Sequence, residues 1–470
     1  MLKGLEVSEI QFSNLSSILR IDAEFFKKPY LLLQEKIRKY KSLDSYLEYL
    51  TDGTHVTPKY MNKGIPFLSS GNIGQLLINF EETKFIGEEE HANLKHCQPS
   101  GLDLLVSKSG RIGHAAVVPE KYIKGSFNIY EGIALLRLKD VHPYTASVIF
   151  NSNLVQLQIK RMQKGVAQPH LHLEDCREIL LPRFSEYFEL SVRNLAVVVS
   201  EYNDMARNRY IEAEHLLLKA IGLEDFSTSS EKINIKSFKD SFVATGRLDA
   251  EYYQCKYEEL IEVVKNHKEG ANVLENFVDS YSTGFPFQSE TYAKDGVYLI
   301  RINNVQRGNL DLSDAIKVPF TDAATLSPKN IAKENDILIS MSGTIGNSCK
   351  IPKGVEAVIN QRIFRFTPKN YDPEVLSLII NSIIGLHQLN RIGTGGVQTN
   401  ISSSDILKIQ IPLLSLTAQS QISSLIQESF TLKTESERLL NVAKQAVEMA
   451  IEQDEESATK WIQEQLKVDQ

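Results

Sequence analysis

Glu186 to Ile221 reads EYFELSVRNLAVVVSEYNDMARNRYIEAEHLLLKAI, and this stretch decides the fold. Its apolar residues form two rows with seven-residue spacing, and alternating intervals of three and four are typical of a heptad seam on an α-helix. One row, interrupted only by Arg209, holds Phe188, Leu195, Tyr202, Leu216 and Leu223, and the other holds Val192, Val199, Ala206, Ala213 and Ala220. We expect a helix ~50 Å long with a packed partner.

The same seam returns about 230 residues downstream in the same register. Its rows are Leu425, Leu432, Leu439 and Ala446 beside Ile422, Ser429, Ser436, Ala443 and Ala450. One row in both stretches is mostly Ala and Ser, which lets two helix backbones approach closely. We therefore predict that the two helices pack on each other; the alternative is two separate surface helices on unrelated domains.

The repeat extends beyond the helices. Arg20–Phe26 returns as Arg247–Tyr253, Gly64–Ile73 as Gly296–Val305, Asp103–Gly113 as Asp336–Gly346, and Gly165–Gln168 as Gly395–Gln398. Colinear matches of this kind indicate one duplicated unit, with a pseudo-twofold axis between the halves.

Each copy has the same order of elements. A helical pattern at Asp22–Lys41, with its twin at Asp249–Asn266, precedes short β-type runs that end at Pro182 or Pro412. The expected fold class is α+β, with two strand-rich globular domains and two long helices. The predicted parts are 1–185 (first helix and domain), 186–222 (long helix, with Gly222 as C-cap), 223–246 (linker), 247–414 (second helix and domain), 415–457 (second long helix) and 458–470 (tail).

Composition excludes several classes of protein. The chain has 470 residues, 42% of them hydrophobic and 24% charged, with a formal net charge of −7. No apolar run reaches the length of a membrane span or of a signal peptide, so we expect a cytoplasmic protein with no membrane contact. The spacing of the four cysteines suits neither a disulfide framework nor a zinc site, so they are expected to be reduced thiols.

The sequence contains no recognisable catalytic motif. It lacks a phosphate-binding P-loop, a dinucleotide fingerprint and a zinc helix, and no Pro-Pro loop of an amino-methyltransferase occurs. His170 and His172 form an H-x-H pair with no third ligand at matching spacing, which favours a loop role over a metal site. We predict no catalytic residue and no metal.

Duplicated polar loops remain as the candidate functional feature. Ser107–Gly113 and Ser340–Gly346 place small hydroxyls and glycines on a turn after a strand, where backbone N–H groups could meet phosphate. The alternative is a structural turn that needs Gly at positive φ. Asp52–Tyr60 is a second polar loop, and its counterpart Ser282–Gln288 carries different side chains, which suits a module that reads two different sequences.

These stretches together resemble the specificity (S) subunit of type I restriction-modification systems, over essentially the whole chain. Asp52–His55 with Gly64–Ile73 looks like the opening of a target-recognition domain, and Asp103–Gly113 and Asp336–Gly346 look like its strand-turn signature. The second copy lacks Asp-Gly-Thr-His at Tyr281–Gln288, where it departs from the family pattern.

The resemblance implies that each domain reads one half of a split sequence in double-stranded DNA. The two helices would pack as an antiparallel coiled coil that spaces the domains and docks two methyltransferase (M) subunits. The chain itself would hold no cofactor, because S-adenosylmethionine, ATP and Mg²⁺ would serve the methyltransferase and the restriction (R) subunits. Half-sites one helical turn apart lie ~34 Å from each other, comparable with the helix length.

Candidate DNA-binding residues follow from the loops. In the first domain they are Thr54, His55, Thr57, Lys59, Tyr60, Lys108, Arg111 and Gln168, and in the second Arg301, Asn303, Asn304, Ser342, Thr344 and Gln398. The shared Gln168 and Gln398 suit a structural or backbone contact better than base discrimination. Rival hypotheses are the specificity subunit of a type IIG-like or phage-exclusion system, an assembly scaffold that does not bind DNA, and a duplicated enzyme with an unrecognised site.

Overall fold

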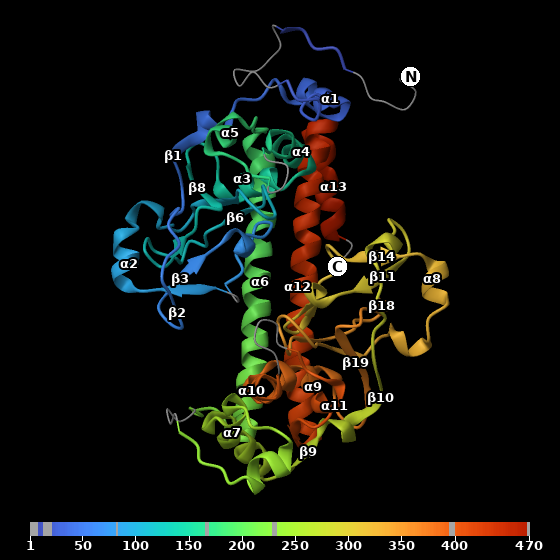
Figure 1. Ribbon diagram of the computed structural model, residues 1–470. Coiled ribbons are helices and arrows are strands. Elements are labelled where there is room, and N and C mark those ends of the chain that lie inside the picture. The colour runs from blue at the N-terminus through green and yellow to red at the C-terminus, as the bar shows by residue number, and fades with distance from the viewer. Residues whose placement is uncertain are drawn as a thin grey trace. The chain divides into compact units, whose positions relative to one another are not determined.

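The computed structural model describes residues 8–12, 21–80, 83–164, 169–227, 233–393 and 400–467. The chain divides into two compact units: unit 1 is Met1–Met205 with Leu432–Gln470, and unit 2 is Ala206–Thr431. The two long helices, α6 (Glu186–Ile221) and α12 (Leu416–Glu452), each contribute one part to either unit (Figure 1).

Unit 1 contains two four-stranded sheets. The first has the order β1 (Leu47–Asp52), β8 (Ile133–Leu138), β5 (Leu104–Ser107) and β6 (Ala115–Val117), with antiparallel neighbours. The second has the order β2 (Tyr60–Met61), β4 (Lys84–Ile86), β3 (Ile65–Leu68) and β7 (Asn128–Ile129), in which β3 and β7 are parallel. The predicted strand-rich domain is confirmed.

Unit 2 repeats the first sheet strand for strand and three strands of the second, whose fourth strand is added at the other edge. One has the order β10 (Val278–Thr283), β19 (Ile363–Pro368), β16 (Ile337–Ser340) and β17 (Ser348–Lys350). The other has the order β14 (Ile316–Val318), β11 (Val297–Ile300), β18 (Ala357–Ile359) and β15 (Ile331–Ala332). Two small sheets are added, formed by β12 (Val305–Gln306) with β13 (Asn309–Leu310), and by β9 (Ala271–Val273) with β20 (Gln410–Pro412).

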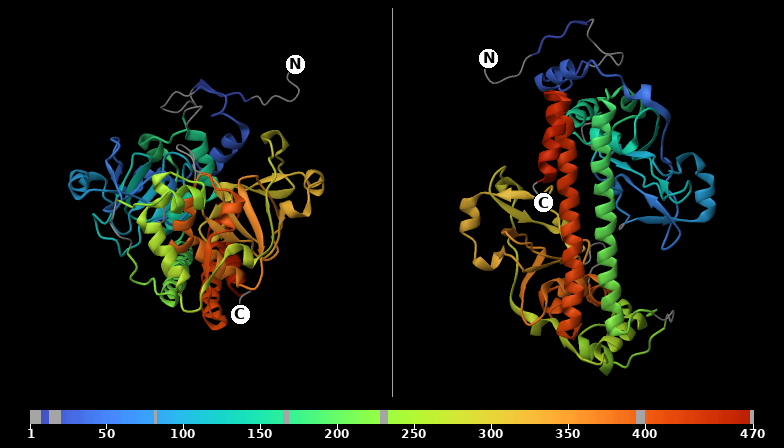
Figure 2. Two further views of the ribbon diagram at one scale, coloured as in Figure 1. Left: turned by 60° about the horizontal axis from the view of Figure 1, so that its bottom comes forward. Right: turned by 180° about the vertical axis from the view of Figure 1, so that it is seen from behind.

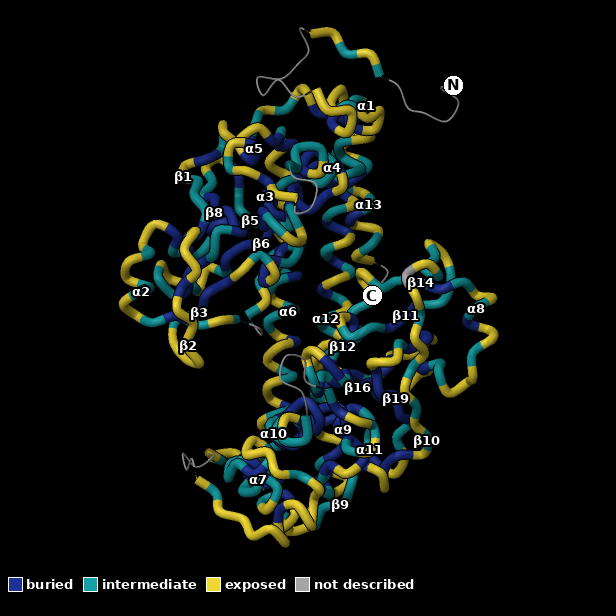
Figure 3. The backbone as a smooth tube through the Cα atoms, in the orientation of Figure 1, coloured by how far each residue is buried: buried dark blue, intermediate teal, exposed yellow. Residues whose placement is uncertain are grey.

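The central strand of each unit shows how the sheets divide the core. Leu104 and Val106 of β5 pack with the helices, whereas Leu105 between them packs in the core that also contains Phe127 and Ile129 beside β3. In unit 2 the residues of β16 alternate in the same way. This period-two alternation is the strand pattern of a sheet that is covered on both faces, and Figure 3 shows β5 buried along its length.

Shorter helices cover the sheets. In unit 1 they are α1 (Lys28–Ile37), α2 (Glu88–Asn93), α3 (Pro143–Phe150), α4 (Asn153–Met162), α5 (Leu173–Glu178) and α13 (Glu455–Lys467). In unit 2 they are α7 (Cys255–Lys265), α8 (Phe320–Ala324), α9 (Pro373–Asn381), α10 (Ile383–Ile392) and α11 (Ser403–Ile406).

A buried asparagine joins helix to sheet at the same place in both units. Asn151, just after α3, donates from Nδ2 to the Ala115 carbonyl at 2.8 Å and accepts from the Ala115 N–H at 3.2 Å. Asn381, 230 residues on, makes the same two bonds with Ser348, at 2.8 and 2.9 Å. The duplication predicted from the sequence therefore reaches individual buried hydrogen bonds.

The seam between the long helices is observed within each unit. In unit 1, Phe188, Val192 and Val199 of α6 share a core with Ala443 and Ala446 of α12. The Ser436 hydroxyl of α12 donates to the Val199 carbonyl of α6 at 2.9 Å. The row of small residues thus lets the two helices approach closely enough for a serine side chain of one to bond to the backbone of the other, as predicted.

Unit 2 holds the other parts of the two helices, which lie side by side in both panels of Figure 2. Ser429 donates to the Ala206 carbonyl at 2.7 Å, repeating the contact of Ser436. Arg209, which interrupts the heptad row, forms ion pairs with Glu428 of α12 at 3.0 Å and with Glu212 at 2.9 Å. In both units α6 and α12 run antiparallel, because the early part of one packs on the late part of the other.

Three predicted boundaries differ from the structure. The first helix begins at Lys28 and not at Asp22, because Pro29 is suited to the first helical turn and turns precede it. Its twin α7 likewise begins at Cys255. The second long helix ends at Glu452, and the predicted tail continues as α13, whose start is capped by the Asp454 carboxylate, which accepts from the Ser457 N–H at 2.7 Å.

The end of α6 agrees with the prediction. Gly222 adopts φ +80°, and the Leu223 N–H donates back to the Leu218 carbonyl at 2.8 Å. This is the bonding of a Schellman cap, which requires a left-handed residue and so favours glycine.

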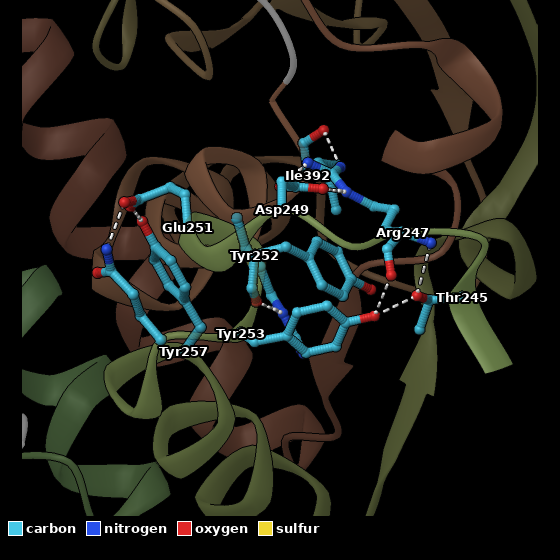
Figure 4. A network of polar contacts seen from close by, with 10 residues as sticks. Thr245, Arg247, Asp249, Glu251, Tyr252, Tyr253, Tyr257 and Ile392 are labelled. Atoms are coloured by element: carbon cyan, nitrogen blue, oxygen red, sulfur yellow. Dashed lines mark hydrogen bonds and ion pairs between the residues drawn. The ribbon is translucent and has the colours of Figure 1, made fainter. Parts of the chain in front are cut away.

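The repeated Arg-x-Asp-Ala-Glu motif has a structural role (Figure 4). In the second copy, Arg247 binds both oxygens of Asp249 at 2.8 and 2.6 Å and donates to the Ile392 carbonyl at the end of α10 at 2.9 Å. Hydrogen bonds from Arg247 lower the pKa of the Asp249 carboxyl. Arg391 donates to the Tyr252 carbonyl at 2.9 Å, so the motif ties the entry of the repeat to α10. Arg20, its partner in the first copy, lies outside the described residues.

Candidate nucleic-acid interface

Three loops meet at one end of the sheets in unit 1. The loop after β1, the turn after β5 and the turn between β7 and β8 are joined by backbone hydrogen bonds: Glu131 N–H to Thr54 carbonyl at 3.1 Å and Lys108 N–H to Gly132 carbonyl at 2.7 Å. A Cβ on Gly53 would lie 2.3 Å from the Ile129 carbonyl oxygen, so the close approach admits only glycine. We call this arrangement the three-loop frame.

Unit 2 contains the same three-loop frame. The Gln361 N–H donates to the Phe285 carbonyl at 3.2 Å, and the Met341 N–H donates to the Arg362 carbonyl at 3.0 Å. A Cβ on Gly284 would lie 2.1 Å from the Ile359 carbonyl oxygen. The backbone of the frame is therefore duplicated, and the two copies can be compared position by position.

The side chains of the frame in unit 1 form a connected set of charges. Lys108 makes an ion pair with Asp52, and both side chains are largely buried. The exposed His55 lies between two carboxylates, with Nδ1 2.8 Å from Glu131 and Nε2 3.4 Å from Asp52. A nucleic-acid base that entered this frame would meet both hydrogen-bond donors and carboxylate acceptors. Such a combination can discriminate between base edges.

The equivalent positions in unit 2 are different. Thr283 stands in place of Asp52, Phe285 in place of Thr54, and Met341 in place of Lys108. Arg362 is exposed and donates from Nη1 to the Asn400 side chain at 3.4 Å. The second frame combines apolar side chains with arginine, so the two frames present different chemistry on one backbone.

The predicted residues of the loop after β1 separate into buried and exposed groups. Thr54 is buried, and its hydroxyl accepts from the Val56 N–H at 3.2 Å, whereas His55 and Thr57 are exposed, with the Thr57 hydroxyl 3.5 Å from that of Tyr130. Lys59 is exposed and donates from its backbone to Glu90 at 3.2 Å.

Tyr60 belongs to β2. It is partly exposed, and the Lys84 ammonium lies 4.2 Å from the centre of its ring. An aromatic ring with an adjacent cation on a loop margin is suited to contact with a base or a phosphate.

The strand-turn signature forms tight turns in both copies. Gly110, Gly113, Gly343 and Gly346 all have positive φ, and the hydroxyl of the serine that ends each strand donates to the backbone carbonyl of Arg111 or Thr344. The structural explanation of these glycines is confirmed. The same turns leave the side chains of Arg111 and Thr344 exposed, while Ser342 is wholly buried.

The predicted polar residues after β11 differ in burial. Asn304 is buried and both ends of its amide are used within the loop: Oδ1 accepts from the Arg301 N–H and Nδ2 donates to the Asp311 carbonyl, each at 2.9 Å. Asn303 is exposed and Arg301 partly so. Gln168 and Gln398 lie outside the described residues.

Several residues of the frame were not among the predicted readers. They are Asp52, Tyr130 and Glu131 in unit 1, and Gln361 and Arg362 in unit 2. A signal was available, because Tyr130-Glu131-Gly132 and Asn360-Gln361-Arg362 occupy matching positions before paired strands yet differ in every residue.

Cys176 and Cys349 are buried in the cores of the two units. Burial raises the pKa of the Cys176 thiol to about 12, and burial also raises the pKa of Cys349. All four cysteines are free thiols, as predicted. Across the part of the chain that the structure describes, no group of three or more His, Cys, Asp or Glu side chains could hold a metal ion.

No single helix within the described ranges is long and apolar enough to cross a membrane. The bent pair α9 and α10 passes such a test only when its two helices are taken together.

Comparison with known proteins identifies the second half of the chain. Residues 278–444 match the family described as Type I restriction modification DNA specificity domain. This stretch is the part of the chain that matches the family. The matched range begins at the first residue of β10 and reaches into α12, so it includes the second three-loop frame and part of the long helix that follows it.

Individual relatives carry the same description. The chain is 26% identical over 175 residues to the type I restriction enzyme EcoAI specificity subunit of Escherichia coli, a match that covers 35% of this chain and 29% of that protein. Among solved structures, an S subunit from M. genitalium covers 88% of this chain and 94% of its own, at 12% identity and a TM-score of 0.37. The HsdS subunit of Thermoanaerobacter tengcongensis covers 88% and 96%, at 13% identity and a TM-score of 0.28.

The first half of the chain repeats the architecture of the matched stretch. Its sheet β1-β8-β5-β6 has the strand order of β10-β19-β16-β17, and the outer pair has a register irregularity at matching places, Leu47/Tyr49 and Val278/Ser280. The chain therefore holds two repeats of one design.

Proposed function

We propose that this chain is the non-catalytic specificity subunit of a type I restriction-modification complex, in which each repeat reads one half of a bipartite sequence in double-stranded DNA. The observation that carries the proposal is the duplicated three-loop frame with different side chains in its two copies. A common backbone with divergent exposed residues supports two related modules with two different targets.

Within this proposal the predicted residues divide their roles. The exposed and partly exposed side chains contact DNA: His55, Thr57, Lys59, Tyr60 and Arg111 in the first repeat, and Arg301, Asn303 and Thr344 in the second, joined by Glu131, Gln361 and Arg362. The buried Thr54, Lys108, Asn304 and Ser342 mainly hold the loops in place, because their polar groups lie inside the fold. Specific contacts worth ~1–3 kcal/mol per base are enough to select a site.

The proposed partners are two methyltransferase subunits and the restriction subunits. S-adenosylmethionine would be bound by the methyltransferase subunits, and ATP and Mg²⁺ would serve the restriction subunits. The surface of α6 supports a docking role, since Tyr187, Leu190, Met205 and Ile211 are exposed apolar residues on a helix whose other side is packed. An exposed apolar patch can mark a protein–protein contact, and the proposal assigns these four side chains to it.

The test is to express this chain with its neighbouring methyltransferase gene in a methylation-free host and to map N6-methyladenine by long-read sequencing. The expected result is a motif of two defined halves around a fixed gap. The same host with either gene alone is the control and should show no motif. Soluble, co-purifying partners that methylate nothing, or that methylate one undivided sequence, would contradict the proposal.

A further inference from the structure

We propose that Arg301 reads a guanine in the DNA half-site of the second repeat. The inference rests on the proposed function, and it assigns one side chain and one base that the proposed function leaves open.

The backbone at Arg301 is held by a frame that both repeats share. Arg301 directly follows β11, and its N–H donates to the Asn304 side chain at 2.9 Å. In the first repeat the Ser69 N–H donates to the Asn72 side chain at 2.8 Å, and both asparagines donate onward to a carbonyl seven residues later. One fixed backbone position therefore carries serine in one copy and arginine in the other.

Two donors beside this position have no partner within the described ranges. The Nε atom of Arg301 is buried and forms no hydrogen bond, and the same holds for the hydroxyl of the wholly buried Ser342. In the first repeat the equivalent Ser109 hydroxyl donates to Ser70 at 3.1 Å, but Ile302 occupies that place in the second. Buried donors without acceptors are rare, and an acceptor supplied by a ligand would satisfy the partly exposed Arg301 side chain.

The charge of Arg301 is also uncompensated by any carboxylate in the described part of the chain. Arg307 and Arg365 of the same unit do have such partners, Glu214 at 2.6 Å and Asp336 at 2.8 Å. The loop that Arg301 begins lies against the turn after β16, since a Cβ on Gly343 would be 3.9 Å from Ile302. An unpaired cation therefore stands at the edge of the second three-loop frame.

The comparison between copies favours a base over a phosphate as the ligand of Arg301. Contacts to the DNA backbone carry no sequence information, so modules that dock alike can keep them in common. Ser109 and Ser342 are common to both copies, whereas Ser69 and Arg301 differ. Arginine pairs best with the O6 and N7 acceptors of guanine in the major groove.

The first experiment maps methylation by Arg301→Ala, with Lys353→Ala as a control of equal charge change on an exposed turn of the same unit. The wild-type motif should contain a guanine in its second half. Arg301→Ala should accept any base at that one position and leave the first half unchanged, while Lys353→Ala should keep the wild-type motif.

The second experiment measures binding of the purified complex to its target with 7-deazaguanine at each guanine of the second half in turn. At one position the loss of N7 should weaken wild-type binding by about 10- to 100-fold and should not weaken Arg301→Ala further. Arg301→Ala that weakens binding to all sequences equally, with a lower salt dependence, would show a phosphate contact and overturn the inference. If the second half of the wild-type motif contains no guanine, the inference about Arg301 is overturned and the proposed function stands. If the wild type shows no bipartite motif, both are overturned.

Discussion

The two three-loop frames differ in how their charges are balanced. In the first, Lys108 is paired with Asp52, and His55 lies between Asp52 and Glu131, so each charged group has a polar partner within the frame. In the second, Met341 replaces the lysine and Arg301 has no ion-pair partner among the described residues. The same backbone thus carries polar side chains that are paired with one another in one copy and an arginine without an ion-pair partner among the described residues in the other. The exposed side chains can therefore change while the backbone of the frame stays the same.

The largest effect should come from the ion pair at the start of the central strand in each unit, β16 and β5. Arg365 and Asp336 are both nearly buried, whereas Arg137, which pairs with Asp103, is 38% exposed. Arg365→Met should lower the free energy of unfolding by about 3–5 kcal/mol, because Asp336 is left buried and charged. Urea unfolding measures the loss.

Arg137→Met is the matched variant in unit 1. Water can reach Asp103 once Arg137 is removed, so the loss should be about 1–2 kcal/mol. Equal losses in the two variants would show that exposure of the arginine does not decide the cost.

The helix seam offers the next comparison. Leu195 is buried in the core of unit 1, and Leu425 is half-buried in unit 2. Leu195→Gln should cost about 2–4 kcal/mol, because an apolar contact is replaced by an amide without partners. Leu425→Gln should cost less than half of that, and a reversed order in urea unfolding would contradict the packing described for the seam.

A smaller effect is expected in the reading loops. Arg111→Ala should reduce base discrimination in the first half of the methylation motif by about 1–3 kcal/mol. The second half should stay unchanged, because Arg111 is an exposed residue of the first frame. Thr344→Ala is the counterpart on the second frame. Methylation mapping that shows both halves altered by Arg111→Ala would refute the independence of the two frames.

The smallest effect expected is on the pH dependence of stability. Burial, with a contribution from Lys256, lowers the pKa of His387 in α10. The unfolded chain therefore takes up a proton that the folded chain resists, and stability should fall as pH drops below about 6.5. His387→Gln should lose less stability than wild type between pH 7.5 and 5.5 in urea unfolding. Identical pH profiles would show that this histidine does not contribute.

Much of the architecture could be predicted because its signals are local. Heptad spacing defined α6, Gly222 marked its end, and glycines at positive φ marked the turns after β5 and β16. Helix starts were less accurate, since Asp22–Phe26 has apolar spacing that suits a helix but forms turns before Pro29. Periodicity reports which residues can share a face, and it does not report where the first hydrogen-bonded turn forms.

The sequence by itself determined the duplication, the two long helices and the loops that differ between the copies. Only the tertiary structure decided which polar groups meet: Lys108 with Asp52, His55 with Glu131, and Arg301 with no carboxylate in the described chain. The physical reason is that spacing along the chain encodes helices, turns and repeats. Ion pairs and unpartnered donors arise where strands distant in the chain are brought side by side, and their cost or gain depends on burial that no local pattern records.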